Sequence, residues 1–408
     1  MISVNDLLKK HCSDTCPEFY LRELEEMNIV KLGRGDVISK NDIRAFPGDY
    51  PVYSSSAINN GEMGRYSKYM FEEELITWSI DGGGKLFYRN KHRYSVTNVS
   101  GWLRVQDNDY LNIKYVYYYL INLWQNMKFD YITKAHPSVI REKYKIKVPQ
   151  LNVQNEIVRI LDNFTELEVK LEAELQARKK QFEYYRNNLL DFTNGYIGLS
   201  KIDEMISDLC PDGVKYVTLG EIGTAFFRGK GIKRDELLDS GFPCIRYGDI
   251  YTKYDFYFSE VDTFTNMNSR TNNKFIEKGD LLFAITGETI DEIGKTVAYT
   301  GDGKMLVGGD IAVMRHLENP KYLAYVMDTQ YLIRQKMIGK VKSKVVHMSV
   351  NDIKSLVIPL PPLKIQNEIV LILDIFNEYV LSKTNGLLAE ISARRKQYEY
   401  YRNKLLTF

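Results

Sequence analysis

The stretch Gln154-Asn-Glu-Ile-Val-Arg-Ile-Leu-Asp162 returns later in the chain as Gln366-Asn-Glu-Ile-Val-Leu-Ile-Leu-Asp374, with eight of nine positions identical. A second pair of segments, 178–192 (RKKQFEYYRNNLLDF) and 394–408 (RRKQYEYYRNKLLTF), agrees at 11 of 15 positions. The offset is 212 residues for the first pair and 216 for the second, so the later copy is four residues longer. The chain is therefore built on an internal repeat.

Both copies predict long helices. Their apolar residues recur at alternating spacings of three and four, which is the pattern of a coiled-coil seam. Each helix follows prolines, Pro149 in the first copy and Pro361-Pro362 in the second, and proline suits the start of a helix. We expect the four extra residues, between Val380 and Leu387, to form a stutter inside a continuous second helix. The expected seam residues are Leu161, Phe164, Leu171, Leu175, Phe182, Tyr185, Leu189, Leu373, Phe376, Val380, Leu387, Ile391, Tyr398, Tyr401 and Leu405.

The repeat predicts the order domain, helix, domain, helix. We expect a first globular domain over 1–149, a first helix over 150–194, a linker over 195–209, a second domain over 210–360 and a second helix over 361–408. If the second helix packs on the first, it must run back along it, so the pair is antiparallel with a pseudo-two-fold repeat. At 1.5 Å per residue, helices of about 40 residues would hold the domains on the order of 60 Å apart.

The regions before the two helices also repeat, though weakly. Short apolar runs separated by Gly, Asn and Asp predict mainly strands, with one late helix in each domain near 112–127 and 320–338. The fold class is therefore α/β, in an α+β arrangement of two globular domains on coiled-coil helices. The matching positions are Cys16-Pro17 with Cys210-Pro211, Arg34-Gly35 with Arg228-Gly229, Tyr50-Pro51 with Phe242-Pro243, Leu75-Ile76 with Leu281-Leu282, and 136–139 with 347–350.

Composition excludes several classes of protein. The 408 residues include 55 Lys+Arg and 53 Asp+Glu, and 44% are hydrophobic, which excludes disordered and collagen-like chains. There is no apolar run of about 18 residues, so we expect a cytoplasmic protein without membrane association. Four cysteines are too few for a disulfide framework, and His11, Cys12 and Cys16 lack a second ligand pair, so no metal site is expected.

The repeated helices, the proline-rich approach to QNEIV and the RRKQYEYYRNKLL ending resemble the specificity subunit of type I restriction–modification systems (the HsdS family). Three further phrases resemble its target-recognition domains: 242–250 (FPCIRYGDI), 278–282 (KGDLL) and 359–363 (PLPPL). The resemblance covers essentially the whole chain. The first domain departs from the pattern, because 50–56 (YPVYSSS) replaces the IRYGDI phrase.

The resemblance implies a non-catalytic, sequence-specific DNA-binding subunit. Each end domain would read one half of a split, asymmetric double-stranded target, and the helices would set the gap and dock two methyltransferase subunits. Motor–nuclease subunits would complete the complex. S-adenosylmethionine, Mg²⁺ and ATP are expected on those partner subunits and not on this chain.

Candidate DNA contacts are basic side chains, with one tyrosine that could stack. In the first domain a glycine-rich loop, 81–84, leads into a basic run, which is equally typical of a DNA-facing hairpin and of a solvated hairpin tip. In the second domain 336–344 holds four lysines and no acid, which favours phosphate contact. The candidates are Arg34, Lys85, Arg89, Lys91, Arg93, Arg228, Lys230, Lys233, Arg234, Arg246, Tyr247, Arg270, Lys274, Lys340, Lys342 and Lys344.

The motifs of catalysis are incomplete. Asn319-Pro-Lys-Tyr322 lacks the second proline of an adenine methyltransferase motif, and Gly294-Lys295-Thr296 lacks the glycine spacing of a Walker A loop. His136 and His347 recur at matched positions, which favours a shared structural role over catalysis. No catalytic residue is expected. The alternative from another class is a coiled-coil scaffold that presents two protein-binding domains without DNA.

Overall fold

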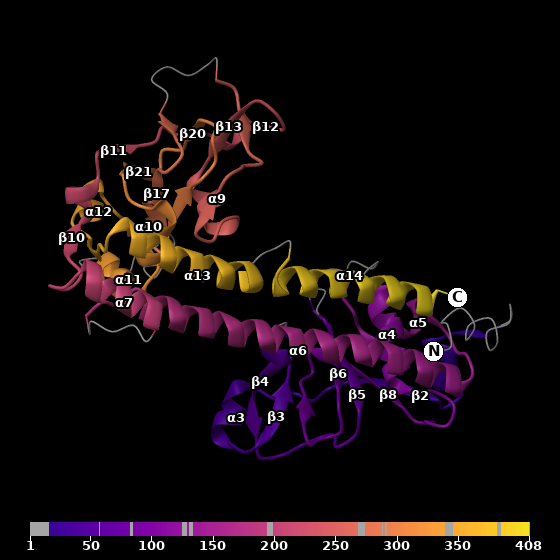
Figure 1. Cartoon of the computed structure of the whole chain (residues 1–408). Helices are drawn as coiled ribbons and strands as arrows, with labels where there is room; N and C mark the ends of the chain where they lie inside the picture. Colours follow the sequence, from indigo (N-terminus) through magenta and orange to yellow (C-terminus); the bar gives the residue numbers. More distant parts are fainter. Residues whose placement is uncertain are drawn as a thin grey trace. The chain divides into compact units, whose positions relative to one another are not determined.

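The computed structural model describes residues 16–56, 58–81, 85–124, 129, 134–193, 199–267, 274–287, 289, 292–338, 346–381 and 385–407. The chain divides into two compact units, Met1–Leu171 with Ile391–Phe408, and Glu172–Glu390. Helix α6 (Leu151–Leu189) is one continuous helix of 39 residues that contributes to both units (Figure 1).

Unit 1 holds the first globular domain. A four-stranded antiparallel sheet has the order β2-β8-β5-β6, and a three-stranded sheet has the order β4-β3-β7, in which β3 and β7 run parallel. The elements are β1 (Glu18–Tyr20), α2 (Leu21–Glu26), β2 (Val30–Arg34), α3 (Lys40–Ala45), β3 (Tyr50–Tyr53), η1 (Asn59–Gly61), β4 (Glu62–Tyr66), β5 (Leu75–Ser79), β6 (Leu86–Arg89), β7 (Ser95–Val96), β8 (Ser100–Val105), α4 (Ile113–Trp124), α5 (Pro137–Lys143) and β9 (Lys145–Lys147).

Unit 2 holds the second globular domain, which has a five-stranded sheet of order β11-β21-β17-β19-β14 and a second one of order β12-β15-β13-β20-β16. Its elements are α7 (Ser200–Leu209), β10 (Tyr216–Thr218), α8 (Leu219–Ile222), β11 (Ala225–Arg228), η2 (Arg234–Glu236), β12 (Leu237–Leu238), β13 (Phe242–Ile245), α9 (Tyr247–Thr252), β14 (Tyr257–Phe258), β15 (Phe264–Thr265), β16 (Phe275–Ile276), β17 (Leu281–Ala284), β18 (Thr286–Gly287), β19 (Thr296–Tyr299), β20 (Met305–Val307), β21 (Ile311–Arg315), α10 (Pro320–Met327), α11 (Gln330–Met337), β22 (Val346–His347), α12 (Val350–Lys354), β23 (Val357–Pro359) and α13 (Leu363–Leu381). Helix α14 (Leu387–Leu406) begins in unit 2 and belongs mostly to unit 1.

The two domains share one topology. The order β11-β21-β17-β19 matches β2-β8-β5-β6, and the parallel pair β13/β20 matches β3/β7. The weak sequence matches fall on equivalent strands: Gly35 and Gly229 each follow the first strand of the main sheet. A Cβ on Gly35 would lie 1.9 Å from the Val96 carbonyl oxygen, and one on Gly229 would lie 2.1 Å from that of Gly308. Only glycine fits this close backbone approach, so the internal repeat extends through the globular domains.

Within each unit the packed helices run antiparallel. In unit 1 Phe164 of α6 stacks on Tyr401 of α14 with ring centroids 5.4 Å apart, and Glu168 pairs with Arg395, earlier in α14. In unit 2 the rings of Tyr185 (α6) and Phe376 (α13) pack with their centroids 5.4 Å apart. The expected seam residues are buried or half-buried, apart from Tyr185, which is 39% exposed. The mixed fold with its coiled-coil helices is confirmed.

Three expectations about individual elements were wrong. The second long helix is two helices, α13 and α14, with Asn385 and Gly386 described between them in a turn (Figure 1). Both residues have low helix propensity, so the insertion breaks the helix. The expected linker contains α7, whose Ile202 and Ile206 are buried in the core of unit 2. The single helix expected over 320–338 is α10 and α11, because the Thr329 hydroxyl accepts from Leu332 N and caps a new helix.

Candidate nucleic-acid interface

In the first domain the basic candidate Arg34 lies where the parallel strands β3 and β7 end. Thr97, just after β7, donates its N–H to Tyr53 O at 2.9 Å. The exposed Arg34 guanidinium donates to the carbonyl oxygen of the next residue, Asn98, through Nη2 (2.6 Å) and Nε (3.0 Å). His136 lies near Arg34, and burial, assisted by the arginine charge, lowers its pKa. We call this end of the β3/β7 pair the first strand-end site.

The second domain repeats this arrangement. Around Val307–Asp310, directly after β20, Lys230 N donates to Val307 O at 3.0 Å, and Val307 N donates to Lys274 O at 3.3 Å. Gly308 N donates to Ile245 O at 2.8 Å, which brings the neighbouring Arg246 to the same place. Arg228 pairs with Asp310 at 3.0 Å. This second strand-end site therefore gathers four candidates that are far apart in sequence: Arg228, Lys230, Arg246 and Lys274.

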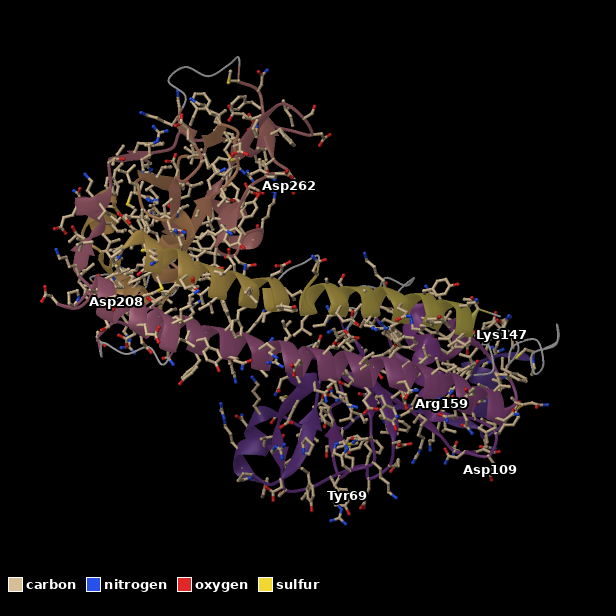
Figure 2. The ribbon with its side chains drawn as sticks, viewed as in Figure 1. Tyr69, Asp109, Lys147, Arg159, Asp208 and Asp262 are labelled. Carbon is tan, nitrogen blue, oxygen red and sulfur yellow. The ribbon has the colours of Figure 1, made fainter. Side chains whose placement is uncertain are left out.

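Other candidates lie at the periphery. Lys233 and Arg234 are exposed at the start of η2, and Tyr247 is 41% exposed at the start of α9. Lys85 and Lys91 are exposed on either side of β6. Arg93 pairs with Glu72 at 3.3 Å and lies over the Tyr69 ring at 5.0 Å. Figure 2 shows Tyr69 at the outer edge of its domain, so this cation–aromatic pair faces solvent.

The expectation that Arg89 contacts DNA is wrong, because its side chain is buried. It is 2% exposed, with its guanidinium 3.7 Å from the Tyr53 ring centroid, and it donates to Thr77 Oγ1 (2.9 Å) and Asn60 O (2.8 Å). Burial lowers its pKa to about 10. A side chain enclosed in this way does not reach a phosphate. Arg270, Lys340, Lys342 and Lys344 lie outside the described residues.

The repeated helix motif anchors the first domain to α6. Asn112 caps α4: its Oδ1 accepts from Lys114 N at 2.8 Å, while its Nδ2 donates to Asn155 Oδ1 at 2.8 Å. Asp162 accepts from Lys114 Nζ at 2.7 Å and from the Tyr118 hydroxyl at 2.6 Å. The amides and the carboxylate of QNEIVRILD are thus used to fix α4 on the helix.

The second copy builds the same anchor in unit 2. Asn319 Nδ2 donates to Asn367 Oδ1 at 2.7 Å, and Asp374 accepts from Lys321 Nζ at 2.6 Å and from the Tyr325 hydroxyl at 2.7 Å. Sequence reasoning identified the helix motif but missed its partner. The missed signal is Asn-x-Lys-Tyr-x-x-Tyr, which occurs at 112–118 and again at 319–325.

The YYRN motifs form a second anchor at the other end of each helix. Arg186 of α6 is buried and donates to the Asp328 carboxylate and, through Nη2 at 2.8 Å, to Asp328 O in unit 2. Its repeat equivalent, Arg402, is buried in unit 1 beside Leu405 and Leu406, which belong to the core of the first domain. Each domain is therefore held by the start of one repeated helix and the end of the other.

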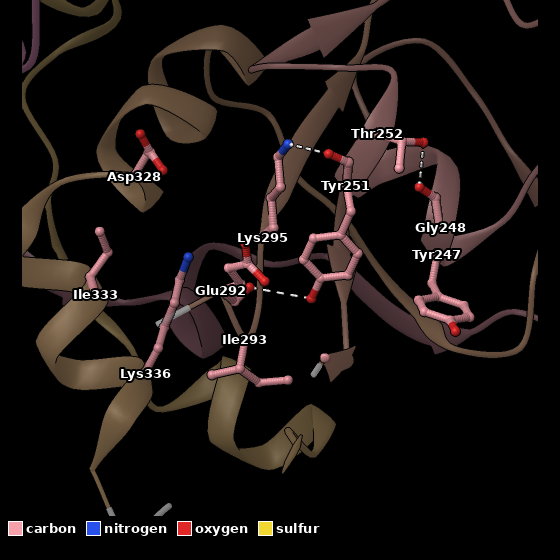
Figure 3. Close-up of a pocket in the computed structure, with 11 residues that line it drawn as sticks. Tyr247, Gly248, Tyr251, Thr252, Glu292, Ile293, Lys295, Asp328, Ile333 and Lys336 are labelled. Atoms are coloured by element: carbon pink, nitrogen blue, oxygen red, sulfur yellow. Dashed lines mark hydrogen bonds between the residues drawn. The ribbon is translucent and has the colours of Figure 1, made fainter. Parts of the chain in front are cut away.

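A cavity of about 530 Å³ adjoins α9 in unit 2 (Figure 3). Tyr251 and Lys336 contribute to its wall, and the Tyr251 hydroxyl donates to Glu292 O at 3.2 Å. Lys336 is 5% exposed, and its Nζ donates to Gly294 O and Met327 O, both at 2.8 Å. Burial lowers the pKa of this lysine to about 8.

Comparison with known proteins decides the family. The model of the type I restriction modification DNA specificity domain matches residues 19–178 and again 211–393. The chain belongs to this family. It is 29% identical to a type I restriction enzyme specificity subunit of Haemophilus influenzae over 94% of both chains, and 30% identical to the EcoR124I/EcoR124II specificity subunit of Escherichia coli over 74% of this chain and 72% of that one.

The fold of this type I specificity chain agrees with solved structures. The type I restriction–modification S subunit of Mycoplasma genitalium superposes with a TM-score of 0.57 over 97% of each chain, at 16% identity. Specificity subunits are the non-catalytic components of type I systems, as the incomplete motifs predicted. Across the described ranges no cluster of three or more His, Cys, Asp or Glu could hold a metal ion, and no described helix could span a membrane.

Proposed function

We propose that this chain binds double-stranded DNA sequence-specifically, with each globular domain reading one half of a bipartite, asymmetric target. One observation carries the proposal. Two domains of divergent sequence place an arginine at the same structural position, the end of the parallel strand pair, where Arg34 donates to Asn98 O and Arg228 donates to Gly309 O. The residues around this arginine differ, since Asp36 and Ser54 of the first domain stand where the second has Lys230 and Arg246. A shared position with different residues suits two readers that contact the DNA backbone alike and the bases differently. A scaffold that binds only proteins gives no reason for this matched placement and is not favoured.

We assign the helices the role of spacer. The Asp162 and Asp374 anchors have the same composition, and a buried arginine from the end of the other repeated helix also holds each domain, so packed polar contacts and not a flexible linker join each domain to its helices. Helix α6 has 39 residues and is about 58 Å long, compared with about 34 Å per turn of B-DNA. This length supports half-sites more than one turn apart, centre to centre.

The same helices would dock two methyltransferase subunits, and motor–nuclease subunits would join the complex. An exposed apolar stripe on α13 supports docking, since Leu371, Ile375 and Tyr379 are 57%, 52% and 74% exposed at successive turns. S-adenosylmethionine, Mg²⁺ and ATP belong to those partner chains in this proposal. The corresponding positions of α6 are Arg159, Asn163 and Leu167, so the two docking faces differ in polarity.

Methylation mapping tests the function directly. A host that expresses this chain with its methyltransferase partner should gain one new methylated motif made of two defined halves separated by a fixed gap. Confirmed expression of both proteins without any new motif would contradict the proposal.

The salt dependence of DNA binding tests which residues contact the DNA phosphates. Lys230→Ala and Lys274→Ala should weaken binding to all sequences, and each should reduce the slope of log affinity against log salt by about 1. The triple replacement of Lys340, Lys342 and Lys344 by Ala tests the candidates outside the described residues. An unchanged slope would remove the altered residues from the footprint.

A further inference from the structure

The loop between β3 and β4 has an unusual backbone. Asn59 and Asn60 have φ angles of 49° and 51°, and Gly61 follows with a φ of 77°. Three successive residues are therefore left-handed, a conformation that L side chains rarely adopt. Among the described residues the only other non-glycine with positive φ is Asn28, at 59°. Such strain persists only where the surroundings impose it, and it often marks a functional segment.

The surroundings here are built around Arg89. Its guanidinium donates to Asn60 O at 2.8 Å from behind the loop and lies 3.7 Å from the Tyr53 ring centroid. Ser54 N donates to Gly61 O at 2.8 Å and closes the loop across its base. A buried arginine is costly, and this one is used to hold a carbonyl group of the loop.

The outer side of the loop faces solvent. Ile58 is 78% exposed, and Asn59 and Asn60 are also exposed. The loop adjoins the first strand-end site, because the Thr97 hydroxyl donates to Ser54 Oγ at 3.0 Å and Thr97 precedes Asn98, the acceptor of Arg34. A loop backbone held by a buried arginine, with exposed side chains beside Arg34, is able to present those side chains to base edges.

We propose that Asn59 and Asn60 read an A·T base pair in the half-site of the first domain and that Arg89 is the positioning residue that presents them. Asparagine is the non-glycine residue that most readily adopts these φ angles, and it adds an amide that glycine lacks. An asparagine amide donates and accepts together and pairs with N6 and N7 of adenine in the major groove, while an aliphatic group such as Ile58 suits the thymine methyl. The inference rests on the proposed function.

Asparagine-to-glycine variants test the readout without disturbing the backbone. Asn59→Gly and Asn60→Gly keep the left-handed conformation and remove the amide, so the complex with the methyltransferase should still fold and bind. Discrimination at one or two positions of one half-site should fall about tenfold to a hundredfold, and the other half-site should be unaffected. The matched control is Asn28→Gly, which removes an exposed left-handed asparagine at the end of α2.

Discrimination is measured by competition binding to duplexes substituted at each position of the target and by methylation mapping. If the wild-type complex methylates a split motif and both loop variants keep its full discrimination, the inference is wrong while the proposed function stands. If the wild type recognises no split motif, the proposed function itself fails.

Arg89 needs a separate test because its removal also affects folding. Arg89→Lys keeps the charge and one donor, and Arg89→Met removes both. A positioning role predicts relaxed discrimination in the first half-site, graded from Lys to Met, with non-specific affinity retained. A merely structural role predicts equal loss for cognate and random duplexes in step with a lowered Tm, and that result would overturn the assignment.

Discussion

At the scale of single residues, the carboxylates of Asp162 and Asp374 join the globular domains to the helices. Each accepts one bond from a lysine ammonium and one from a tyrosine hydroxyl of its own unit. Burial and the adjoining carboxylate raise the pKa of Tyr118 and of Tyr325, so both hydroxyls stay protonated and donate. The two tyrosine donors therefore do not titrate in the physiological range.

Removing one donor from each anchor should destabilise one unit at a time. Tyr118→Phe should weaken unit 1 and Tyr325→Phe unit 2, each by about 1–3 kcal/mol, because a bond to a charged acceptor is lost. Hydrogen exchange of α4 and α10 measures the two effects separately. Tyr184→Phe is the control, since Tyr184 is 62% exposed and should change stability by less than about 0.5 kcal/mol. If either variant reduced hydrogen-exchange protection equally in α4 and α10, the two anchors would not be independent.

The buried Lys336 gives unit 2 a pH dependence of its own. Its folded pKa of about 8 lies below the value of about 10.4 in an unfolded chain, so the unfolded state binds more protons between these values. Stability contributed by this group should therefore rise from about pH 8 to about pH 10.4 and be flat below that window. Urea unfolding of wild type and Lys336→Met, compared across the window, isolates this contribution. A constant difference between the two proteins would show that the lysine is not neutral when folded.

At the scale of elements, each domain is supported by two helix ends from different repeats. Leu189, near the end of α6, is in the core of unit 2, and its repeat equivalent Leu405, near the end of α14, is in the core of unit 1. The C-terminal helix thus completes the N-terminal domain. This connection explains why the ends of the repeat are the parts that match best in sequence.

A matched pair of leucine variants tests this exchange. Leu189→Ala and Leu405→Ala remove equally buried side chains, each 2% exposed, and should cost about 2–5 kcal/mol. All three tryptophans, Trp78, Trp102 and Trp124, lie in unit 1, so their fluorescence reports that unit alone. Leu405→Ala should shift the fluorescence transition, whereas Leu189→Ala should shift only the transition of unit 2 seen by circular dichroism. If Leu189→Ala shifted the fluorescence transition and Leu405→Ala did not, the end of α14 would not complete the first domain.

The elements also show where sequence reasoning succeeds and where it does not. The 3–4 spacing and the repeat predicted the long helices and the paired domains, because periodicity reports directly on burial. Arg89 and Arg93 lie four positions apart in one basic run, yet one is buried and the other is half exposed. Their difference depends on Tyr53 and Asn60, which are distant in sequence, so no local pattern could separate them. The break before α14 was missed because Asn385-Gly386 was interpreted as part of a coiled-coil stutter.

At the scale of the whole molecule, the proposed function makes helix length a determinant of the DNA target. Deleting residues 169–175 from α6 and 388–394 from α14 removes one heptad from each helix near the boundary between the units, and it preserves the seam register. Each helix shortens by about 10 Å, and B-DNA rises about 3.4 Å per base pair. The preferred gap should therefore shorten by up to about three base pairs, with both half-sites unchanged.

Affinity should also fall in this variant, because three base pairs turn the duplex by roughly 100° and the shortened helices do not supply an equal rotation. Methylation mapping of the variant gives the new gap, and the anchors predict that the bases of both half-sites are retained because neither domain has been altered. A variant that keeps the original gap with full activity would show that the helices do not set the spacing. Deleting the heptad from α6 alone is the control, since it leaves the seam mismatched and should abolish methylation.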